Sequence, residues 1–167
     1  MEIAVLKPPG QRGSFSVGTR QTEQSLADLP AAHLKLLDEA VTASMSCLNA
    51  NGTIHISPVW VSRDNNEILV NSVRGRQKDR NLRQRRHASL LFVNPGNPYQ
   101  WMSIQGVVDD VIDEDDPVRG SLATHSIDQL SQMYLGESTY PLRDPDGTEV
   151  RSLYRIRPTR VVVFGGS

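Results

Sequence analysis

The stretch TIHISPVWVSRDNNEILVNS (Thr53–Ser72) decides the fold class. It holds two runs rich in β-branched and aromatic residues, Thr53–Ser62 and Glu67–Ser72, on either side of the turn signal Asp64-Asn-Asn66. Two runs of this kind joined by a short Asn-containing turn are typical of a pair of antiparallel strands. The stretch therefore predicts a hairpin.

Toward the N-terminus the same pattern continues. Residues 41–48 form a third strand-like run, which the turn signal Asn49-Ala-Asn-Gly52 separates from the hairpin. A short helix is predicted before it, over about Leu29–Glu39, because Asp28 can cap its first turn and its leucines can share one face. The three strands in series predict an antiparallel meander.

Toward the C-terminus the chain alternates extended runs with two helical patterns. We predict helices near Lys78–Arg85 and Pro117–Leu135, strands at His87–Val93 and Trp101–Val111, and two closing extended pieces at Glu149–Pro158 and Arg160–Phe164. No β-α-β alternation is present, so a doubly wound parallel sheet is not expected. The sequence predicts a mainly β fold, a six- or seven-stranded antiparallel split barrel with two to three helices.

Length and composition favour one domain. The chain has 167 residues, a net charge of -1 and 38% hydrophobic residues, enough for a core without disulfides or metals. Residues 1–27, rich in Pro and Gly, are predicted to form an extended N-terminal arm, and residues 28–167 the domain. The single cysteine, Cys47, reads as a core residue. Neither a leader nor a membrane span of about 20 apolar residues is recognised, so a cytoplasmic protein is expected.

A basic stretch follows the hairpin directly. Val73–Arg86 holds seven of the eighteen Lys and Arg residues of the chain. Asn71-Ser72 at the strand end, a turn at Gly75, and Arg76 and Lys78 opening a helix would surround a phosphate with amides, short polar groups and cations. Two other interpretations remain open, a solvated helix that balances nearby acidic residues and a strip that binds nucleic acid.

Two groups of aromatic residues could border a ring-shaped ligand. Pro58 in Ser57-Pro-Val-Trp60 cannot donate a ladder hydrogen bond, so it marks an edge or a bulge beside a flat indole. Tyr99-Gln-Trp101 follows a Pro-Gly loop and could line a pocket or pack as strand-end residues.

An ordered series of motifs resembles a known family. His55-Ile-Ser-Pro-Val-Trp60, Ile68-Leu-Val-Asn-Ser72, Gly75-Arg-Gln-Lys-Asp-Arg-Asn-Leu82, Ala88-Ser-Leu-Leu91 and Ile104-Gln-Gly106 follow one another in this order. The series resembles the pyridoxamine 5'-phosphate oxidase-like split-barrel flavoproteins, and is most similar to the branch that uses the deazaflavin coenzyme F-420. The resemblance extends over about residues 29–164.

This resemblance implies a cofactor site made by two chains. The phosphate would be held by Arg76, Lys78, Gln77, Asn71 and Ser72. The tricyclic ring would run beside Ser57, Pro58, Val59 and Trp60. Tyr99 and Trp101 match positions that reach the cofactor from the second subunit, which implies a homodimer with composite sites.

The activity implied is that of an F-420-dependent oxidoreductase, which passes a hydride between the reduced cofactor and a small unsaturated or quinone-like substrate. The alternative is an FMN-binding oxidoreductase or a pyridoxamine 5'-phosphate oxidase-like flavoprotein, and a nucleic-acid-binding barrel ranks third. The deazaflavin itself carries the chemistry, so no catalytic residue is nominated. The four histidines show no metal-ligand spacing, so no metal is expected, nor is a nucleic-acid or membrane partner.

Overall fold

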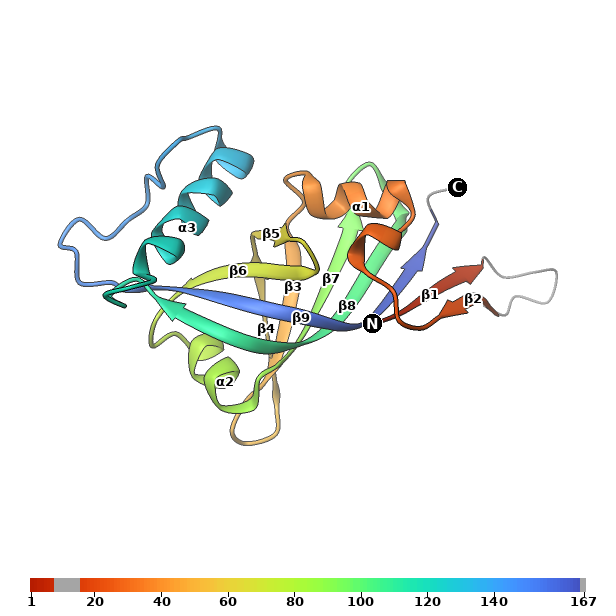
Figure 1. Cartoon of the computed structure of the whole chain (residues 1–167), viewed down its shortest axis with the longest axis horizontal. Coiled ribbons are helices and arrows are strands. Elements are labelled where there is room, and N and C mark those ends of the chain that lie inside the picture. Colours follow the sequence, from red (N-terminus) through yellow and green to blue (C-terminus); the bar gives the residue numbers. More distant parts are fainter. Residues whose placement is uncertain (8–15, 166–167) are drawn as a thin grey trace.

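The computed structural model describes residues 1–7 and 16–165 of the chain. Within them nine strands form one sheet, in the order β2-β1-β9-β8-β7-β3-β4, with β6 pairing with both β9 and β5. Figure 1 shows the long strands β8 and β9 running through the molecule and the helices packed around the curved sheet. The strands are β1 (Glu2–Lys7), β2 (Ser16–Gln21), β3 (Ala43–Leu48), β4 (Ile54–Val59), β5 (Val61–Asp64), β6 (Glu67–Val73), β7 (His87–Asn94), β8 (Asn97–Asp113) and β9 (Arg151–Phe164).

The mainly β split-barrel fold predicted from the sequence is confirmed, but its strand count and pairing differ. Nine strands are found in the described residues instead of six or seven. Two of the additional ones are β1 and β2, which form an antiparallel hairpin. The pairing of β1 with β9 is parallel, so the sheet is mixed and not wholly antiparallel.

Strand β9 changes its neighbour halfway along. Residues 151–156 pair with β6, and residues 160–164 pair with β1, while β8 lies along the other side of the strand. Pro158 lies between the two partners, opposite Gly106 at a register shift in β8. A proline has no N–H to donate, so it fits a position where neither β6 nor β1 pairs with that edge of β9. The two closing pieces predicted from the sequence are therefore one continuous strand.

The strand predicted over residues 53–62 is divided. It breaks at Trp60 into β4, which ends at Val59, and β5, which begins at Val61. Strand β4 pairs only with β3 among the described strands, so Pro58 lies on an edge of the sheet, one of the two positions predicted for it. The chain turns at Trp60 from one wall of the barrel to the next.

The helices cover the open parts of the barrel. They are α1 (Ala31–Asp38), α2 (Gln77–Arg85) and α3 (Gly120–Leu135), and a short 3-10 helix, η1 (Leu26–Asp28), precedes α1. Helix α3 begins three residues later than predicted, because Asp116 caps a preceding turn through the amides of Val118 and Arg119. It ends at Gly136, as predicted, with φ of 78°. No helix in the described part of the chain is long and apolar enough to span a membrane.

The core lies inside the barrel, and a smaller cluster lies under α3. Phe92, Met102, Ile104, Tyr154 and Ile156 are fully buried at the centre, and Cys47 is part of the same cluster, as predicted. The second cluster joins Ala123 of α3 to the outer face of the sheet through Leu69, Ile112 and Leu153. Packing of this second cluster holds α3 beside the mouth of the barrel.

The predicted N-terminal arm is largely part of the sheet. Ile3 and Ala4 of β1 are buried, and the backbone amide of Gln24 donates to the carbonyl of Met1. Residues 8–15, which include the Pro8-Pro-Gly10 segment of the predicted arm, lie outside the described residues.

Candidate functional site

A pocket of about 200 Å³ opens at the mouth of the barrel, between strand ends and helices α2 and α3. Strands supply polar groups and an edge, the α2 N-terminus supplies cations, and α3 supplies an apolar wall. The lining residues are Thr42, Pro58, Val59, Trp60, Asn71, Ser72, Arg76, Lys78, Ile127, Leu130, Tyr140 and Arg151.

Two cations reach the pocket from the turn between β6 and α2. Gly75 has φ of 85°, a left-handed conformation that glycine adopts without strain. Arg76 follows as the N-cap of α2, and Lys78 lies in its first turn. Burial, and then the charge of Arg76, hold the pKa of Lys78 below its usual value of 10.5. No carboxylate among the described residues forms an ion pair with this ammonium, so its charge is not compensated within the pocket.

A third cation comes from the first residue of β9. Arg151 is only 6% exposed, and its guanidinium lies 4.6 Å from the centre of the Tyr140 ring. Its side chain has no ion pair with any described residue. A buried cation whose side chain makes no ion pair is costly, and an anion in the pocket would compensate it.

Few carboxylates approach these cations. Of the three, only Arg76 contacts one within the described residues, and that contact with Glu149 is 3.4 Å long. Beside the cations lie two oxygens without a hydrogen-bond partner, Oγ of Ser72 and Oδ1 of Asn71. The amide group of Asn71 donates to the carbonyl of Ala123, which fixes the orientation of this side chain. Ser72 can donate its hydroxyl proton, so the pocket offers hydrogen-bond donors and positive charge together.

An aromatic cluster forms another wall. Trp60 stacks on Tyr134 of α3 at a centroid distance of 5.0 Å, and Tyr140 meets the indole edge-on at 6.0 Å. The Tyr134 hydroxyl donates to the Val41 carbonyl and accepts from the Val61 amide, at the break between β4 and β5. Burial raises the pKa of Tyr134, so the hydroxyl stays protonated near neutral pH.

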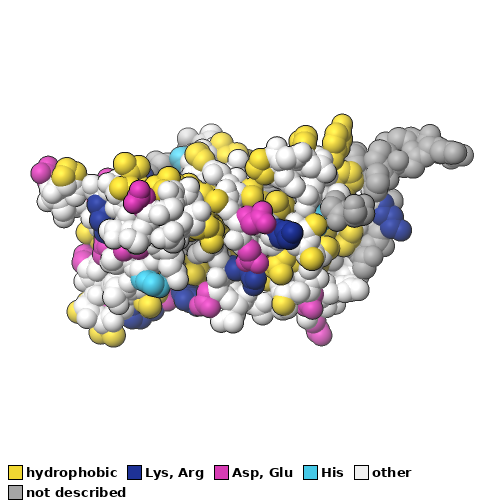
Figure 2. Space-filling model, turned by 90° about the horizontal axis from the view of Figure 1, so that it is seen from above, with side chains coloured by type: hydrophobic (Ala, Val, Ile, Leu, Met, Phe, Trp, Pro, Cys, Tyr) yellow, Lys and Arg dark blue, Asp and Glu magenta, His cyan; other side chains and the backbone are white. Residues whose placement is uncertain are grey.

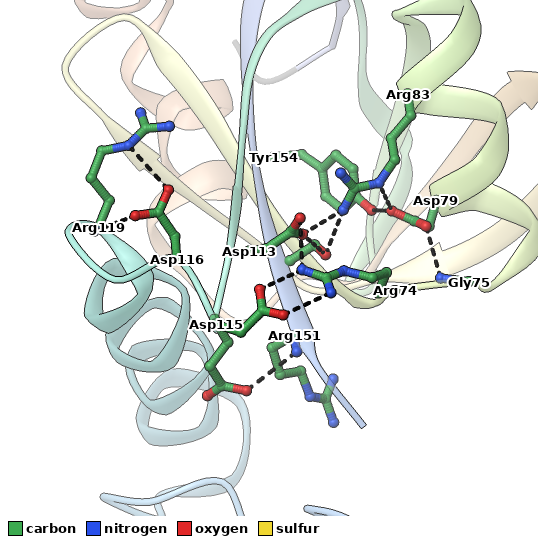
Figure 3. A network of polar contacts seen from close by, with 12 residues as sticks. Arg74, Gly75, Asp79, Arg83, Asp113, Asp115, Asp116, Arg119, Arg151 and Tyr154 are labelled. Atoms are coloured by element: carbon green, nitrogen blue, oxygen red, sulfur yellow. Dashed lines mark hydrogen bonds and ion pairs between the residues drawn. The ribbon is translucent and has the colours of Figure 1, made fainter. Parts of the chain in front are cut away.

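The basic stretch as a whole is not one anion-binding strip. Arg74 pairs with Asp113 and Asp115, and Arg83 pairs with Asp79 and Asp113 (Figure 3). On the face shown in Figure 2, basic and acidic side chains lie next to one another without a large area of one sign. The interpretation that the cations balance nearby acidic residues therefore holds for Arg74 and Arg83. Arg76 and Lys78 line the pocket instead.

The structure brings together most of the residues predicted from the sequence. Those that line the pocket are Pro58, Val59, Trp60, Asn71, Ser72, Arg76 and Lys78. Ser57 and Gln77 do not line it, since Ser57 pairs across β3 with Met45 and the Gln77 side chain donates to Asn49 and Asn81. Tyr99 and Trp101 of β8 lie beside the C-terminal end of β9, where Trp101 packs on Phe164, whereas Arg151 of the pocket lies at its N-terminal end.

Five lining residues were missed, namely Thr42, Ile127, Leu130, Tyr140 and Arg151. Ile127 and Leu130 carried the helical apolar pattern that predicted α3, but nothing in that pattern says which site the helix covers. Arg151 had one usable signal. It is a cation at the start of a predicted strand, and the structure shows that the first four residues of this strand are buried.

The sheet and the pocket at its mouth define a split-barrel protein. The chain belongs to the pyridoxamine 5'-phosphate oxidase family, whose sequence profile matches residues 29–163. No curated protein sequence matches the chain.

Solved structures share this fold at low sequence identity. An F420 reductase is 23% identical with a TM-score of 0.66, covering 80% of this chain and 98% of its own. A conserved hypothetical protein from Mycobacterium tuberculosis is 21% identical with a TM-score of 0.61, covering 84% and 89%. The heme storage protein HutZ from Vibrio cholerae is 15% identical with a TM-score of 0.55, covering 78% and 91%.

Proposed function

We propose that this protein binds the deazaflavin coenzyme F-420 and acts as an oxidoreductase that transfers a hydride between the reduced cofactor and a small unsaturated or quinone-like substrate. The observation that carries the proposal is the set of three cations in one pocket, Arg76, Lys78 and Arg151, with a single long carboxylate contact. Such a pocket is suited to an anion of more than one charge, as a phosphate group is.

The residues present fit a phosphate. Arg76 and Lys78 would hold it from the start of α2, where backbone N–H groups of the first turn also face outward. Ser72 would donate its hydroxyl, which has no hydrogen-bond partner among the described residues. The oxygen of Asn71 can only accept, so it would meet a hydroxyl or N–H of the ligand and not the phosphate.

A ring system would lie farther along the pocket. Pro58, Val59 and Trp60 give it a flat edge, and Ile127 and Leu130 give an apolar wall that excludes water. When bound, a deazaflavin supplies two-electron hydride transfer. The part of the chain itself is to bind, to orient the ring and to keep water away from it.

Two other cofactors can be compared with this pocket. FMN also joins a phosphate to a tricyclic ring, so an FMN-dependent oxidoreductase is the alternative. The likeness to a heme storage protein does not extend to the chemistry of the lining, since the described residues around the pocket include no histidine, cysteine or methionine that could bind heme iron.

We further propose that the working unit is a homodimer. Leu48, Ile54, Ile56, Leu91 and Val93 are exposed, and strand pairing places them on the same outer face of β4, β3 and β7. Ile54 and Ile56 are 71% and 66% exposed, which is unusual for neighbouring side chains of a lone sheet. A second copy of the chain would cover this face.

The pocket itself also favours a second copy. At about 200 Å³ it is smaller than the roughly 300 Å³ at which small-molecule sites begin. Tyr99 and Trp101 cannot complete it within the same chain, because they lie by Phe164, about 40 Å of strand from Arg151 at ~3.3 Å per residue. Their counterparts in a second copy could supply the missing wall.

The proposal is tested by titrating the protein with coenzyme F-420, FMN, heme and single-stranded DNA. Binding of F-420 at micromolar concentration or tighter, with weaker binding of the other three, is expected. Turnover with reduced F-420 and a quinone would then be measured by the gain in absorbance of the oxidised cofactor as the quinone is reduced to the hydroquinone. Tight binding of FMN without binding of F-420 would replace the proposal with its alternative, and binding of neither would refute it.

A further inference from the structure

The turn that carries Arg76 is fixed by a buried carboxylate. Asp79 is 2% exposed, and its Oδ2 accepts a hydrogen bond of 2.7 Å from the backbone amide of Gly75. Arg76 itself makes no side-chain cap of α2. The carboxylate of the third helical residue therefore holds the chain one residue before the N-cap, as the acidic residue of a capping box holds the N-cap amide.

Asp79 is in turn held by two donors on its other oxygen. The hydroxyl of Tyr154 and the Nε of Arg83 both donate to Oδ1, the latter at 2.6 Å (Figure 3). Tyr154 is fully buried in β9, so it cannot swing away. Burial, and then the hydrogen bond to Asp79, raise the pKa of Tyr154, so this hydroxyl stays protonated and able to donate at neutral pH.

The network continues to the other side of the turn. Arg83 donates to Asp113 and to Ser152 Oγ, and Asp113 also pairs with Arg74 at 2.8 Å. The backbone amide of Arg74 donates to the Val150 carbonyl at 2.9 Å. Both residues before Arg76 are thus anchored to the sheet. The Arg76 side chain, which is 54% exposed, keeps only its long contact with Glu149.

We propose that Asp79 is the positioning residue of the phosphate site, and that Tyr154 orients its carboxylate. The network fixes the backbone from which Arg76 extends and leaves the guanidinium available to the ligand. Little backbone conformational entropy is therefore lost when the phosphate binds. This inference rests on the proposed function, because it assumes that the ligand carries a phosphate.

The test measures how much the phosphate contributes to binding. Affinities of FMN and riboflavin are compared, and likewise those of F-420 and its 5'-hydroxyl form without the phosphate. The measured ratio is the dissociation constant of the form without phosphate divided by that of the form with it. For FMN it is the phosphate contribution, and for F-420 it also includes the tail that the phosphate joins to the ring. A residue that merely stabilises the fold would change both affinities alike, whereas a positioning residue changes the ratio.

Asp79→Asn is expected to lower the ratio about tenfold and Tyr154→Phe about threefold, with the affinities of the forms without phosphate unchanged. Gly75→Ala is a third variant, which changes the same turn and leaves the Asp79 side chain itself in place. A Cβ there has open space, so the variant only strains the turn at its positive φ. Gly136→Ala is its matched control, with φ of 78° and the same open space at the end of α3.

Each outcome decides between the two proposals. A wild-type protein that binds both members of each pair equally has no phosphate site, and then the proposed function fails together with this inference. A wild-type ratio well above one that persists in folded Asp79→Asn or Tyr154→Phe refutes the positioning role alone. If Asp79→Asn does not fold, Tyr154→Phe and Gly75→Ala give the answer.

Discussion

The indole of Trp60 and the ring of Tyr134 are stacked, with their centroids 5.0 Å apart and their planes 12° apart. The two residues come from the break between β4 and β5 and from the last turn of α3. Their contact joins the helix to the mouth of the barrel, so that Ile127 and Leu130 of α3 face the pocket. The aromatic pair is therefore part of how the pocket obtains its apolar wall.

Removing the Tyr134 hydroxyl should weaken this connection. Tyr134→Phe keeps the stack with Trp60 but leaves the Val41 carbonyl and the Val61 amide without their partner. We expect the free energy of unfolding to fall by about 1–2 kcal/mol, as measured by urea denaturation. Tyr140→Phe is the control, and its loss should stay within about 0.5 kcal/mol. Equal losses in the two variants would contradict the role given to the Tyr134 hydroxyl.

The cations at the start of α2 should each contribute to cofactor binding. Arg76→Ala and Lys78→Ala are expected to weaken binding of F-420 or FMN by roughly 1–3 kcal/mol each, the loss expected for a charge-assisted contact. Isothermal titration calorimetry would measure it. Arg85→Ala provides a matched control on the same helix, because Arg85 contacts only Gln84 with its side chain. Normal binding by both pocket variants would show that the phosphate lies elsewhere.

Binding should also weaken at high pH through Lys78. Burial and the charge of Arg76 hold its pKa below 10.5 in the free protein, and a bound phosphate would raise it again. Affinity is therefore constant below the pKa of the free protein and falls as the pH rises through it. Measurements start above pH 7, where a phosphate monoester such as that of FMN, with a second pKa of about 6, is already fully charged.

Lys78→Arg isolates this effect, since an arginine stays protonated over the whole range. The difference between wild type and variant removes any titration of the ligand itself. Parallel pH profiles for the two proteins would show that Lys78 does not bind the phosphate.

Arg151 should lower the stability of the protein without ligand and raise its affinity for the cofactor. Arg151→Met removes a buried cation that has no carboxylate partner but keeps an unbranched side chain against Tyr140. We expect thermal stability without ligand to be equal or higher, and cofactor affinity to fall about tenfold. Arg119→Met, which breaks the exposed pair with Asp110, should change neither quantity much. A variant that loses stability but binds normally would refute a role in anion binding.

The exposed face of β4 should control assembly. Ile56→Asp places a charge on the apolar face and is expected to give a monomer by light scattering coupled to size exclusion. It should also lose cofactor affinity, because Tyr99 and Trp101 of a second copy would no longer reach the pocket. Val118→Asp is the control, since Val118 is 86% exposed and lies in the turn before α3. A wild-type protein that is monomeric at micromolar concentration would refute the dimer.

The local parts of the fold could be predicted because their signals are local. Turn residues marked the β3–β4 hairpin and the β5–β6 hairpin, and Gly136 marked the end of α3. The break at Trp60 could not be predicted, since it depends on Tyr134, which is more than seventy positions away. Pro158 suggested a boundary between two strands, whereas the sheet uses it where β9 exchanges one neighbour for another.

The residues of the site can likewise be divided into those that local signals predict and those that depend on long-range contacts. Arg76, Lys78, Asn71 and Ser72 are close in sequence, so their meeting in one pocket could be predicted from a strand, a turn and a helix start. Arg151 enters the pocket through the pairing of β6 with β9, and Tyr140 enters it from the loop between α3 and β9, and no short motif records either arrangement. The pairing of Arg74 with Asp113 and Asp115 likewise depends on that long-range arrangement, and it separates Arg74 from the two cations of the pocket that are its neighbours in sequence.

The exchange of neighbours at Pro158 gives the protein two regions that can vary separately. The half of β9 before the proline holds β6, and with it the turn of Arg76 and the pocket. The half after it holds β1, which lies outside the segment shared with the family. Insertions or substitutions in the N-terminal hairpin therefore affect the half of β9 that pairs with β1. The half that pairs with β6 beside the pocket keeps its hydrogen bonds. New features can be added at that end of the chain while the geometry around the ligand is conserved.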